Sequence, residues 1–360
     1  MHWPQSEDYS FQFMQLLGAA QDGGSTVSEC FLAASGIDPT DDESWYREWK
    51  KLAETSRERG NIAIRKGHTQ TALSNWLRAI NYYRACQVFL GSDDPRRAAT
   101  VDDMRSCSRL YLQSAAAGDA VEISWADGEV LQAYFLPAPR QSGPSPVVIC
   151  FGGPDQFKEE FLHSLPHYAH RRGLSLLLVD LPGHCSGAAP GQGLGRYAIE
   201  TAISAWVDYL TARDDVDPQR IAIFGDGLGA AFATRGASFD GRFAAAVCDG
   251  GIWDLHERSF LASNPASCGN AVAAFEKLCG NSIARTIRCP ILVTIGEHDW
   301  LDADHVTGCC QALRAGGLDI DLKIFTAAET AAGPAHIDNP TIGNEFTFDW
   351  IADQLGSSEI

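Results

Sequence analysis

The sequence predicts an α/β protein: a mostly parallel β-sheet flanked by helices, preceded by a helical N-terminal module. Three observations predict it. Apolar runs typical of strands buried on both faces alternate with helical stretches in the later part of the chain. An antiparallel hairpin pattern precedes these runs. The earlier part shows helical spacing of apolar side chains and no strand alternation. The 360 residues suffice for one large α/β domain with an extra module.

Residues 1–118 are predicted to form the helical module. Trp45 and Trp49 recur at helical spacing, and a second apolar helical face covers residues 71–90. A third helix is expected over residues 101–117. The block contains no Gly-rich active loop, so we expect it to contribute to a cap rather than to carry the chemistry.

Residues 119–358 are predicted to form the α/β core. Residues 121–125 and 130–136 alternate between apolar and polar side chains, which indicates a hairpin. The connection 252–288 is long for a β-to-α link, and we expect it to form a cap over the carboxyl edge of the sheet. Strands are expected at 147–151, 174–179, 221–224, 244–248 and 291–295, with an edge strand at 319–325. Helices are expected at 197–213, 228–238, 303–315 and 344–355.

The composition excludes several classes of protein. The formal net charge of −18 argues against nucleic acid and anionic membranes as partners. No apolar run approaches the roughly 20 residues of a membrane span, and the N-terminus has no signal-peptide pattern. The 11 cysteines form no C-x-x-C pair, so reduced thiols and a cytoplasmic location are expected.

The stretch 220–230 has the pattern of a buried strand, a sharp turn and the start of a helix. This is the setting of the G-x-S-x-G nucleophile elbow of α/β-hydrolases, in which small flanking residues accommodate a strained turn. Gly225 and Gly229 supply both flanking glycines, but Gly227 occupies the position of the serine. The predicted site therefore lacks the oxygen that attacks a substrate.

The other members of a catalytic triad are expected downstream in the order acid, then base. Asp299 follows the strand 291–295 and is the candidate acid, with Asp302 as the fallback. His336, in a loop after the last strand, is the candidate base. An acid that accepts the Nδ1–H of this histidine would leave Nε2 facing the substrate. Taken alone, Asp299 is equally compatible with a helix N-cap.

An oxyanion hole is expected from two backbone N–H groups, one of them that of Leu228. The second belongs to the loop 151–155. Gly153 would supply a donor, whereas Pro154 has none, and the sequence leaves the register open. The residues expected to line the substrate pocket are Asp226, Gly152, Pro154, Trp253 and Trp300. As a substitute nucleophile Asp226 is disfavoured, because it precedes the apex of the turn by one residue.

An alternative hypothesis is a dinucleotide site. Gly225-x-Gly227-x-x-Ala230 satisfies the G-x-G-x-x-G/A fingerprint, and Asp249 stands where a ribose-binding carboxylate belongs. However, at least two parallel strands precede this fingerprint, which normally marks the first. The histidines show no H-x-H or H-E-x-x-H spacing, so neither a cofactor nor a metal is expected.

Taken in order, these stretches resemble the α/β-hydrolases with a helical N-terminal module. This group includes 2,6-dihydropseudooxynicotine hydrolase, the fungal yellowish-green polyketide hydrolases and the FrsA-like esterases. The resemblance implies a small-molecule substrate with an activated acyl group, such as a β-diketone or polyketide, cleaved at a C–C or ester bond by a serine. It also implies a possible homodimer. The matching stretches are 45–90, 151–160, 180–184, the elbow, Gly296-Glu297-His298-Asp299 and Ala335-His336.

Gly227 leaves three hypotheses open within this resemblance. The chain is a hydrolase whose nucleophile has been deleted, or a natural non-hydrolytic enzyme, or a binding protein without catalysis. In the second hypothesis, His336 and Asp299 act as the general base of a cyclase, dehydratase or lyase.

Overall fold

The computed structural model describes residues 6–91, 93–139, 143–153, 156–182, 199–251 and 287–357. The chain divides into two compact units. The first comprises Met1–Ala120 with Glu159–Pro166, and the second comprises Val121–Lys158 with His167–Ile360. The segment Glu159–Pro166, which the sequence analysis placed in the core, thus groups with the helical unit.

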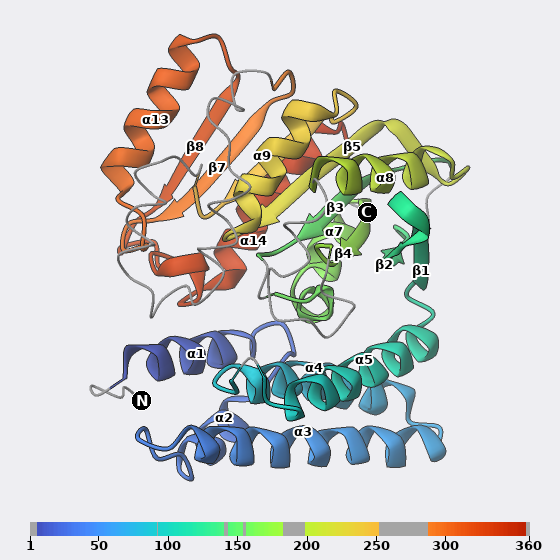
Figure 1. The fold of residues 1–360 in the computed structure, drawn as a ribbon, viewed down its shortest axis with the longest axis vertical. Coiled ribbons are helices and arrows are strands. Elements are labelled where there is room, and N and C mark those ends of the chain that lie inside the picture. Colours follow the sequence, from blue (N-terminus) through green and yellow to red (C-terminus); the bar gives the residue numbers. More distant parts are fainter. Residues whose placement is uncertain are drawn as a thin grey trace. The chain divides into compact units, whose positions relative to one another are not determined.

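In the described residues, the first unit contains the helices α1 to α5 (Figure 1) and the short helix α6. Polar N-caps fix where three of them begin, because a side-chain oxygen of Ser6, Thr26 or Asp41 accepts a backbone N–H of the first turn. Buried indoles fill the interior, and the Nε1–H of Trp45 donates to the carbonyl of Ala85 at 2.9 Å. The helices are α1 (Glu7–Gly18), α2 (Val27–Ala34), α3 (Asp42–Arg65), α4 (Thr69–Gln87), α5 (Arg96–Ala115) and α6 (Phe161–Ser164).

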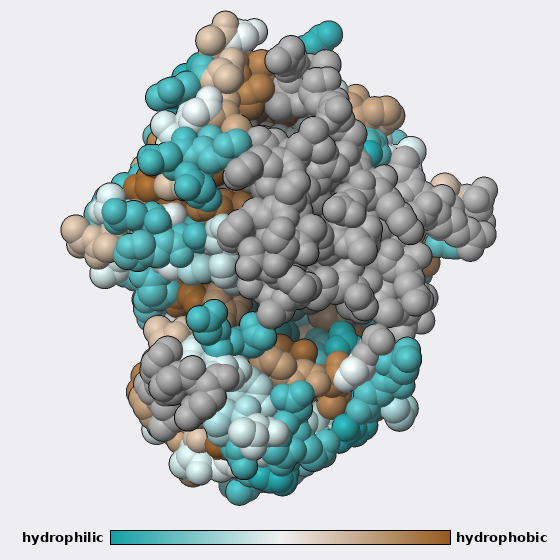
Figure 2. All heavy atoms as spheres, turned by 60° about the vertical axis from the view of Figure 1, so that its left-hand side comes forward, coloured by the Kyte–Doolittle hydropathy of each residue, from teal (hydrophilic) through white to brown (hydrophobic). Residues whose placement is uncertain are grey.

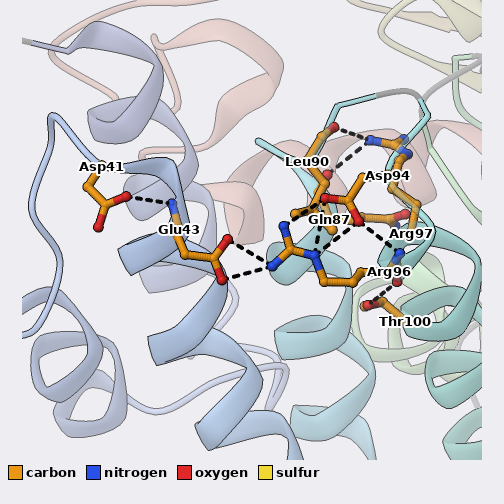
Figure 3. A network of polar contacts seen from close by, with 8 residues as sticks. All are labelled: Asp41, Glu43, Gln87, Leu90, Asp94, Arg96, Arg97 and Thr100. Carbon is orange, nitrogen blue, oxygen red and sulfur yellow. Dashed lines mark hydrogen bonds and ion pairs between the residues drawn. The ribbon is translucent and has the colours of Figure 1, made fainter.

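A polar network joins the connection between α4 and α5 to the start of α3 (Figure 3). The Arg96 guanidinium donates from Nη1 to both carboxylate oxygens of Glu43 at 2.8 Å, and from Nε and Nη2 to Asp94. Arg97 donates to two main-chain carbonyls at the end of α4. Because Arg96 is more than a third exposed, we expect this network to fix geometry and to add little stability.

The second unit contains an eight-stranded sheet in the order β1-β2-β4-β3-β5-β6-β7-β8. The pairing of β2 with β4 is antiparallel, and all pairings from β4 to β8 are parallel. The strands are β1 (Asp119–Ser124), β2 (Val130–Leu136), β3 (Ser145–Phe151), β4 (Ser175–Val179), β5 (Val216–Asp226), β6 (Ala245–Asp249), β7 (Ile291–Gly296) and β8 (Ile320–Phe325). The principal helices are α7 (Pro166–Arg171), α8 (Ile199–Thr211), α9 (Gly229–Phe239), α13 (Ala303–Ala315) and α14 (Pro340–Gln354).

The mostly parallel sheet with flanking helices, preceded by a helical unit, confirms the predicted fold class. The strand β8 lies at the edge of the sheet, as predicted, and α13 has the predicted bounds. The helix α14 begins at Pro340, earlier than predicted, because proline is well suited to the first turn of a helix. The cap-forming connection expected at 252–288 falls almost wholly on 252–286, outside the described residues.

On the face drawn in Figure 2, hydrophilic residues of the described part are interspersed with hydrophobic patches. Within the described ranges, no helix is both long and apolar enough to cross a membrane. The eight cysteines in these ranges are free thiols, and all but Cys309 are buried.

Candidate active site

The elbow connects β5 to α9, and its geometry explains two of its glycines. Gly227 adopts φ +55°, the left-handed conformation at the apex of the turn. A Cβ on Gly225 would lie 2.3 Å from the carbonyl oxygen of Gly229, and a Cβ on Gly229 would lie 2.9 Å from that of Phe151. Both contacts are with backbone atoms that have little room to move. The flanking glycines are therefore required for β5, α9 and the end of β3 to approach one another.

The apex itself has room for a side chain. No described heavy atom lies within 4 Å of a Cβ built on Gly227. The Gly227 N–H donates to the carbonyl of Asp249 at 2.8 Å, and a Cβ on Gly250 would lie 3.2 Å from the Gly227 Cα. The end of β6 therefore packs directly against the elbow.

The strand register places three polar residues in one row at the carboxyl edge of the sheet. Asp226 of β5 pairs with Asp249 of β6, which pairs with Thr294 of β7. The Thr294 hydroxyl donates to Asp249 Oδ1 at 2.6 Å. Ligands bind at this edge in open parallel sheets. This row was not predicted from the sequence, although the two aspartates follow predicted strands at 221–224 and 244–248.

The buried imidazole of His336 lies against Asp249. Its Nε2 is 2.9 Å from Asp249 Oδ1, and its Nδ1 is 2.8 Å from the carbonyl oxygen of Ala331. The Phe325 ring packs edge-on against the imidazole at 4.7 Å between centroids. These contacts fix both the position and the orientation of the ring.

The hydrogen bonds of His336 favour a doubly protonated ring. A carbonyl only accepts, so Nδ1 carries a hydrogen, and a carboxylate partner favours a second hydrogen on Nε2. Burial works against the charged imidazole, but the charge and hydrogen bond of Asp249 outweigh it and raise the pKa of His336 to about 9. Burial raises the pKa of the Asp249 carboxyl, but the charge and hydrogen bond of His336 outweigh this effect and hold that pKa below its usual value. The two groups form a buried ion pair at neutral pH.

The loop that carries His336 is strained. Thr330, Ala331, Ala335 and His336 all have φ between +50° and +65°, a conformation rare for residues with a side chain. Asp338 stabilises the loop by accepting two of its main-chain N–H groups, at 2.9 and 3.1 Å. Strain of this kind is concentrated at functional sites.

The predicted pairing of Asp299 with Nδ1 of His336 is wrong in this structure. The Ala331 carbonyl takes that position, and the carboxylate that bonds to the ring, Asp249, does so at Nε2. Asp249 entered the sequence analysis only through the dinucleotide hypothesis. The fallback acid, Asp302, is the N-cap of α13 and accepts the N–H of His305 at 2.8 Å.

Asp299 nevertheless belongs to the same electrostatic cluster. Burial raises the pKa of its carboxyl to about 6, partly offset by the positive charge of His336 and reinforced by the negative charge of Asp249. Its Oδ2 is buried and accepts no hydrogen bond from the described residues. A carboxyl with a pKa near neutrality and a vacant acceptor atom can take up a proton.

Both predicted oxyanion donors, the N–H groups of Leu228 and Gly153, lie in the described residues. Leu228 is the N-cap residue of α9, so its N–H has no partner within the helix. The N–H of Gly153 donates to Oε1 of Gln156 at 2.8 Å, and a Cβ on Gly152 would lie only 2.1 Å from that oxygen. Gln156 was absent from the predicted site, and no motif in the sequence marks it.

The remaining predicted pocket residues are less constrained. Asp226 Oδ2 accepts the Nε2–H of Gln156 at 2.8 Å, and Trp300 is half-buried next to Asp299. Pro154 and Trp253 lie outside the described residues. Nowhere in the described ranges do three or more His, Cys, Asp or Glu side chains gather as they would around a metal ion. Asp249 Oδ1, on the carboxylate that the dinucleotide hypothesis assigned to a ribose, is bonded instead to Thr294 and His336.

Comparison with known proteins identifies the class to which the fold and site belong. The profile of the family "Esterase FrsA-like" matches residues 40–264. The chain therefore belongs to the FrsA-like esterase family of α/β-hydrolases, as the sequence analysis anticipated.

Individual relatives lie within the same class. The chain is 33% identical over 263 residues to 20-hydroxy-prefusarin hydrolase FUS2 of Gibberella moniliformis, covering 70% of this chain and 62% of that protein. It is 29% identical over 262 residues to the hydrolyase poxO of Penicillium oxalicum, covering 69% and 62%. The chain thus spans less than two thirds of the length of these relatives.

Solved structures share the fold. The crystal structure of 2,6-dihydroxy-pseudo-oxynicotine hydrolase matches with a TM-score of 0.75 at 21% identity, covering 94% of this chain and 95% of that one. Wild-type AbyA5 matches with a TM-score of 0.67 at 15% identity, covering 98% and 96%.

Proposed function

We propose that this chain is an α/β-hydrolase-family enzyme that transforms a small β-dicarbonyl or polyketide-like substrate by proton transfer, without forming an acyl-enzyme. The single observation that carries the proposal is the arrangement around the elbow. The apex residue, Gly227, has no nucleophilic atom, yet a buried His336–Asp249 ion pair and the buried carboxyl of Asp299 lie at the same edge of the sheet.

The electrostatics of these groups support separate roles for them. Environments that push the pKa values of neighbouring groups apart distinguish the acid from the base. With a pKa of about 9, His336 holds a proton at neutral pH and suits the role of general acid. With a pKa of about 6, Asp299 is mostly ionised there and suits the role of general base. This assignment reverses the roles expected from the sequence.

The proposed reaction can be written for a β-hydroxy ketone. The carboxylate of Asp299 removes the proton next to the carbonyl, and the N–H of Leu228 stabilises the enolate oxygen. The β-hydroxyl takes the place of Asp249 Oδ1 as the partner of His336 Nε2 and receives its proton. The hydroxyl leaves as water, and a conjugated enone forms. Asp299 then returns its proton to His336, so the enzyme ends in its starting state.

The names of the relatives support an α/β-hydrolase-family enzyme with a polyketide-like substrate. One relative is named 20-hydroxy-prefusarin hydrolase, and another is named a hydrolyase. Hydrolysis of an ester or C–C bond by an attacking water is the second candidate, because no heavy atom of the described residues lies within 4 Å of a Cβ built on Gly227. A binding protein without turnover is the third.

The test uses a β-hydroxy-β-aryl ketone, whose dehydration gives a conjugated enone that absorbs in the ultraviolet. We expect turnover by the unaltered chain, loss of turnover in His336→Ala and Asp299→Asn, and retention of most of it in Gly227→Ala. Thermal melting of each variant controls for folding. Turnover that survives in His336→Ala would refute the proposed role of that residue. Binding of the ketone without turnover would favour the binding protein.

A further inference from the structure

The side chain of Gln156 joins the two halves of the candidate oxyanion site. Its Oε1 accepts the N–H of Gly153, and its Nε2 donates to Asp226, the residue before the apex of the elbow; both distances are 2.8 Å. The N–H of Gln156 also donates to the Gly153 carbonyl at 3.1 Å, which closes a turn. The side chain is therefore held at both ends of its amide.

The absence of a side chain at Gly152 makes this position possible. A Cβ on Gly152 would lie 2.1 Å from Oε1 and 2.6 Å from the Cβ of Gln156. Gly152 was expected to line the substrate pocket, where a substrate carbonyl would approach the backbone. The space beside it is occupied by a side chain of the protein itself. The occupying atom is chemically similar to that carbonyl, because an amide oxygen is also a neutral acceptor.

We propose that Gln156 is a positioning residue that occupies the Gly153 half of the oxyanion hole, so that its displacement by substrate controls access to the second donor. The N–H of Leu228 is one of the two donors of such a hole, and the N–H of Gly153 is the other. An oxygen that binds at Leu228 gains the second hydrogen bond only when the amide of Gln156 turns away. The inference rests on the proposed function only in placing a substrate oxygen at Leu228.

A structural role confined to closing the turn makes a different prediction. The bond from Nε2 to Asp226 is not needed to close the turn, yet it holds the amide toward the elbow. If the amide only stabilises the loop, its removal lowers stability or binding and never increases a rate. If it competes with substrate for a donor, its removal increases the rate of a reaction that develops an oxyanion.

The test therefore measures a gain of activity in a background with a nucleophile. The Gly227→Ser variant and the double variant Gly227→Ser/Gln156→Ala are assayed on p-nitrophenyl acetate, with kcat and KM determined separately. We expect kcat of the double variant to exceed that of the single variant about tenfold. This gain is smaller than the roughly 10²–10³-fold loss of kcat that follows deletion of an oxyanion donor. We expect the thermal midpoint to change little.

Two further variants make the result decisive. Gln132→Ala, in the same serine background, removes an amide that donates to the carboxylate of Glu122 at 3.0 Å away from the elbow, and it should leave kcat unchanged. Gln156→Asn shortens the side chain by one methylene and should also increase kcat. This variant is used in place of Gln156→Ala if the alanine variant does not fold. A double variant no faster than Gly227→Ser, whether or not the single variant is active, would overturn the proposal. The assay involves neither a ketone nor Asp299, so its failure is distinct from failure of the proposed function.

Discussion

The buried ion pair between His336 and Asp249 should make the stability of the protein depend on pH in a way that one substitution abolishes. In the folded chain the pKa of His336 is raised from 6.5 to about 9. The stabilisation is therefore fully present below about pH 6.5 and is lost as the pH rises through about 9, because the folded state then gives up a proton that the unfolded state has already lost. The full effect corresponds to about 3 kcal/mol.

The perturbation is Asp249→Asn, which removes the charge and keeps the shape of the side chain. Urea unfolding at pH 6, 7, 8, 9 and 10 gives the free energy of unfolding of both proteins. We expect the unaltered chain to be more stable than the variant by about 3 kcal/mol at pH 6, and the difference to shrink toward zero at pH 10. Cysteines and tyrosines titrate in both proteins, so most of their contribution cancels in the difference; Cys248, whose pKa the charge of Asp249 helps to raise, is the exception. A difference that stays constant from pH 6 to 10 would refute the ion pair.

Three further outcomes follow from the structure. Burial raises the pKa of Asp299 to about 6, so the ionised carboxyl destabilises the folded protein above that pH. Asp299→Asn should therefore increase the free energy of unfolding, measured with urea at pH 8, by about 1–3 kcal/mol. The same substitution should abolish turnover. Gly225→Ala should destabilise the protein by about 2 kcal/mol or more, seen as a lower thermal midpoint, because the new Cβ meets a backbone oxygen at 2.3 Å. Lys158 and Asp180 form a buried ion pair at 2.6 Å, so Asp180→Asn should lower the free energy of unfolding by about 3–5 kcal/mol. Arg96→Ala, in the exposed network, should lower it by no more than about 1 kcal/mol. Equal losses of stability in the two variants would contradict the reasoning.

Much of the fold could be predicted because its signals are local. Apolar runs such as 291–295 are buried on both faces. The glycines on either side of Gly227 are needed where the tight elbow brings backbone segments into contact. The position of His336 was also predictable, because the loop after the last strand lies at the carboxyl edge of the sheet. These features depend on chain order and on spacing, which the sequence displays directly.

The partners of the site residues could not be predicted, because they depend on register and loop geometry. Asp249 meets His336 only because β6 lies between β5 and β7 and the loop after β8 folds back over them. The hydrogen bonds of Gln156 depend on how closely its amide approaches Gly153 and Asp226, which the sequence does not display. Asp299 has the position expected of the acid, but the carbonyl of Ala331 occupies the place in which its carboxylate was expected.

The central claim is that this chain has the elbow of an α/β-hydrolase with room for a nucleophilic side chain at its apex, where Gly227 supplies no attacking oxygen. The measurement that tests it most directly treats the chain and its Gly227→Ser variant with a serine-directed phosphonate and weighs both proteins by mass spectrometry. We expect a single phosphonate adduct on the variant and none on the unaltered chain. A Gly227→Ser variant that folds and stays unlabelled would contradict the claim.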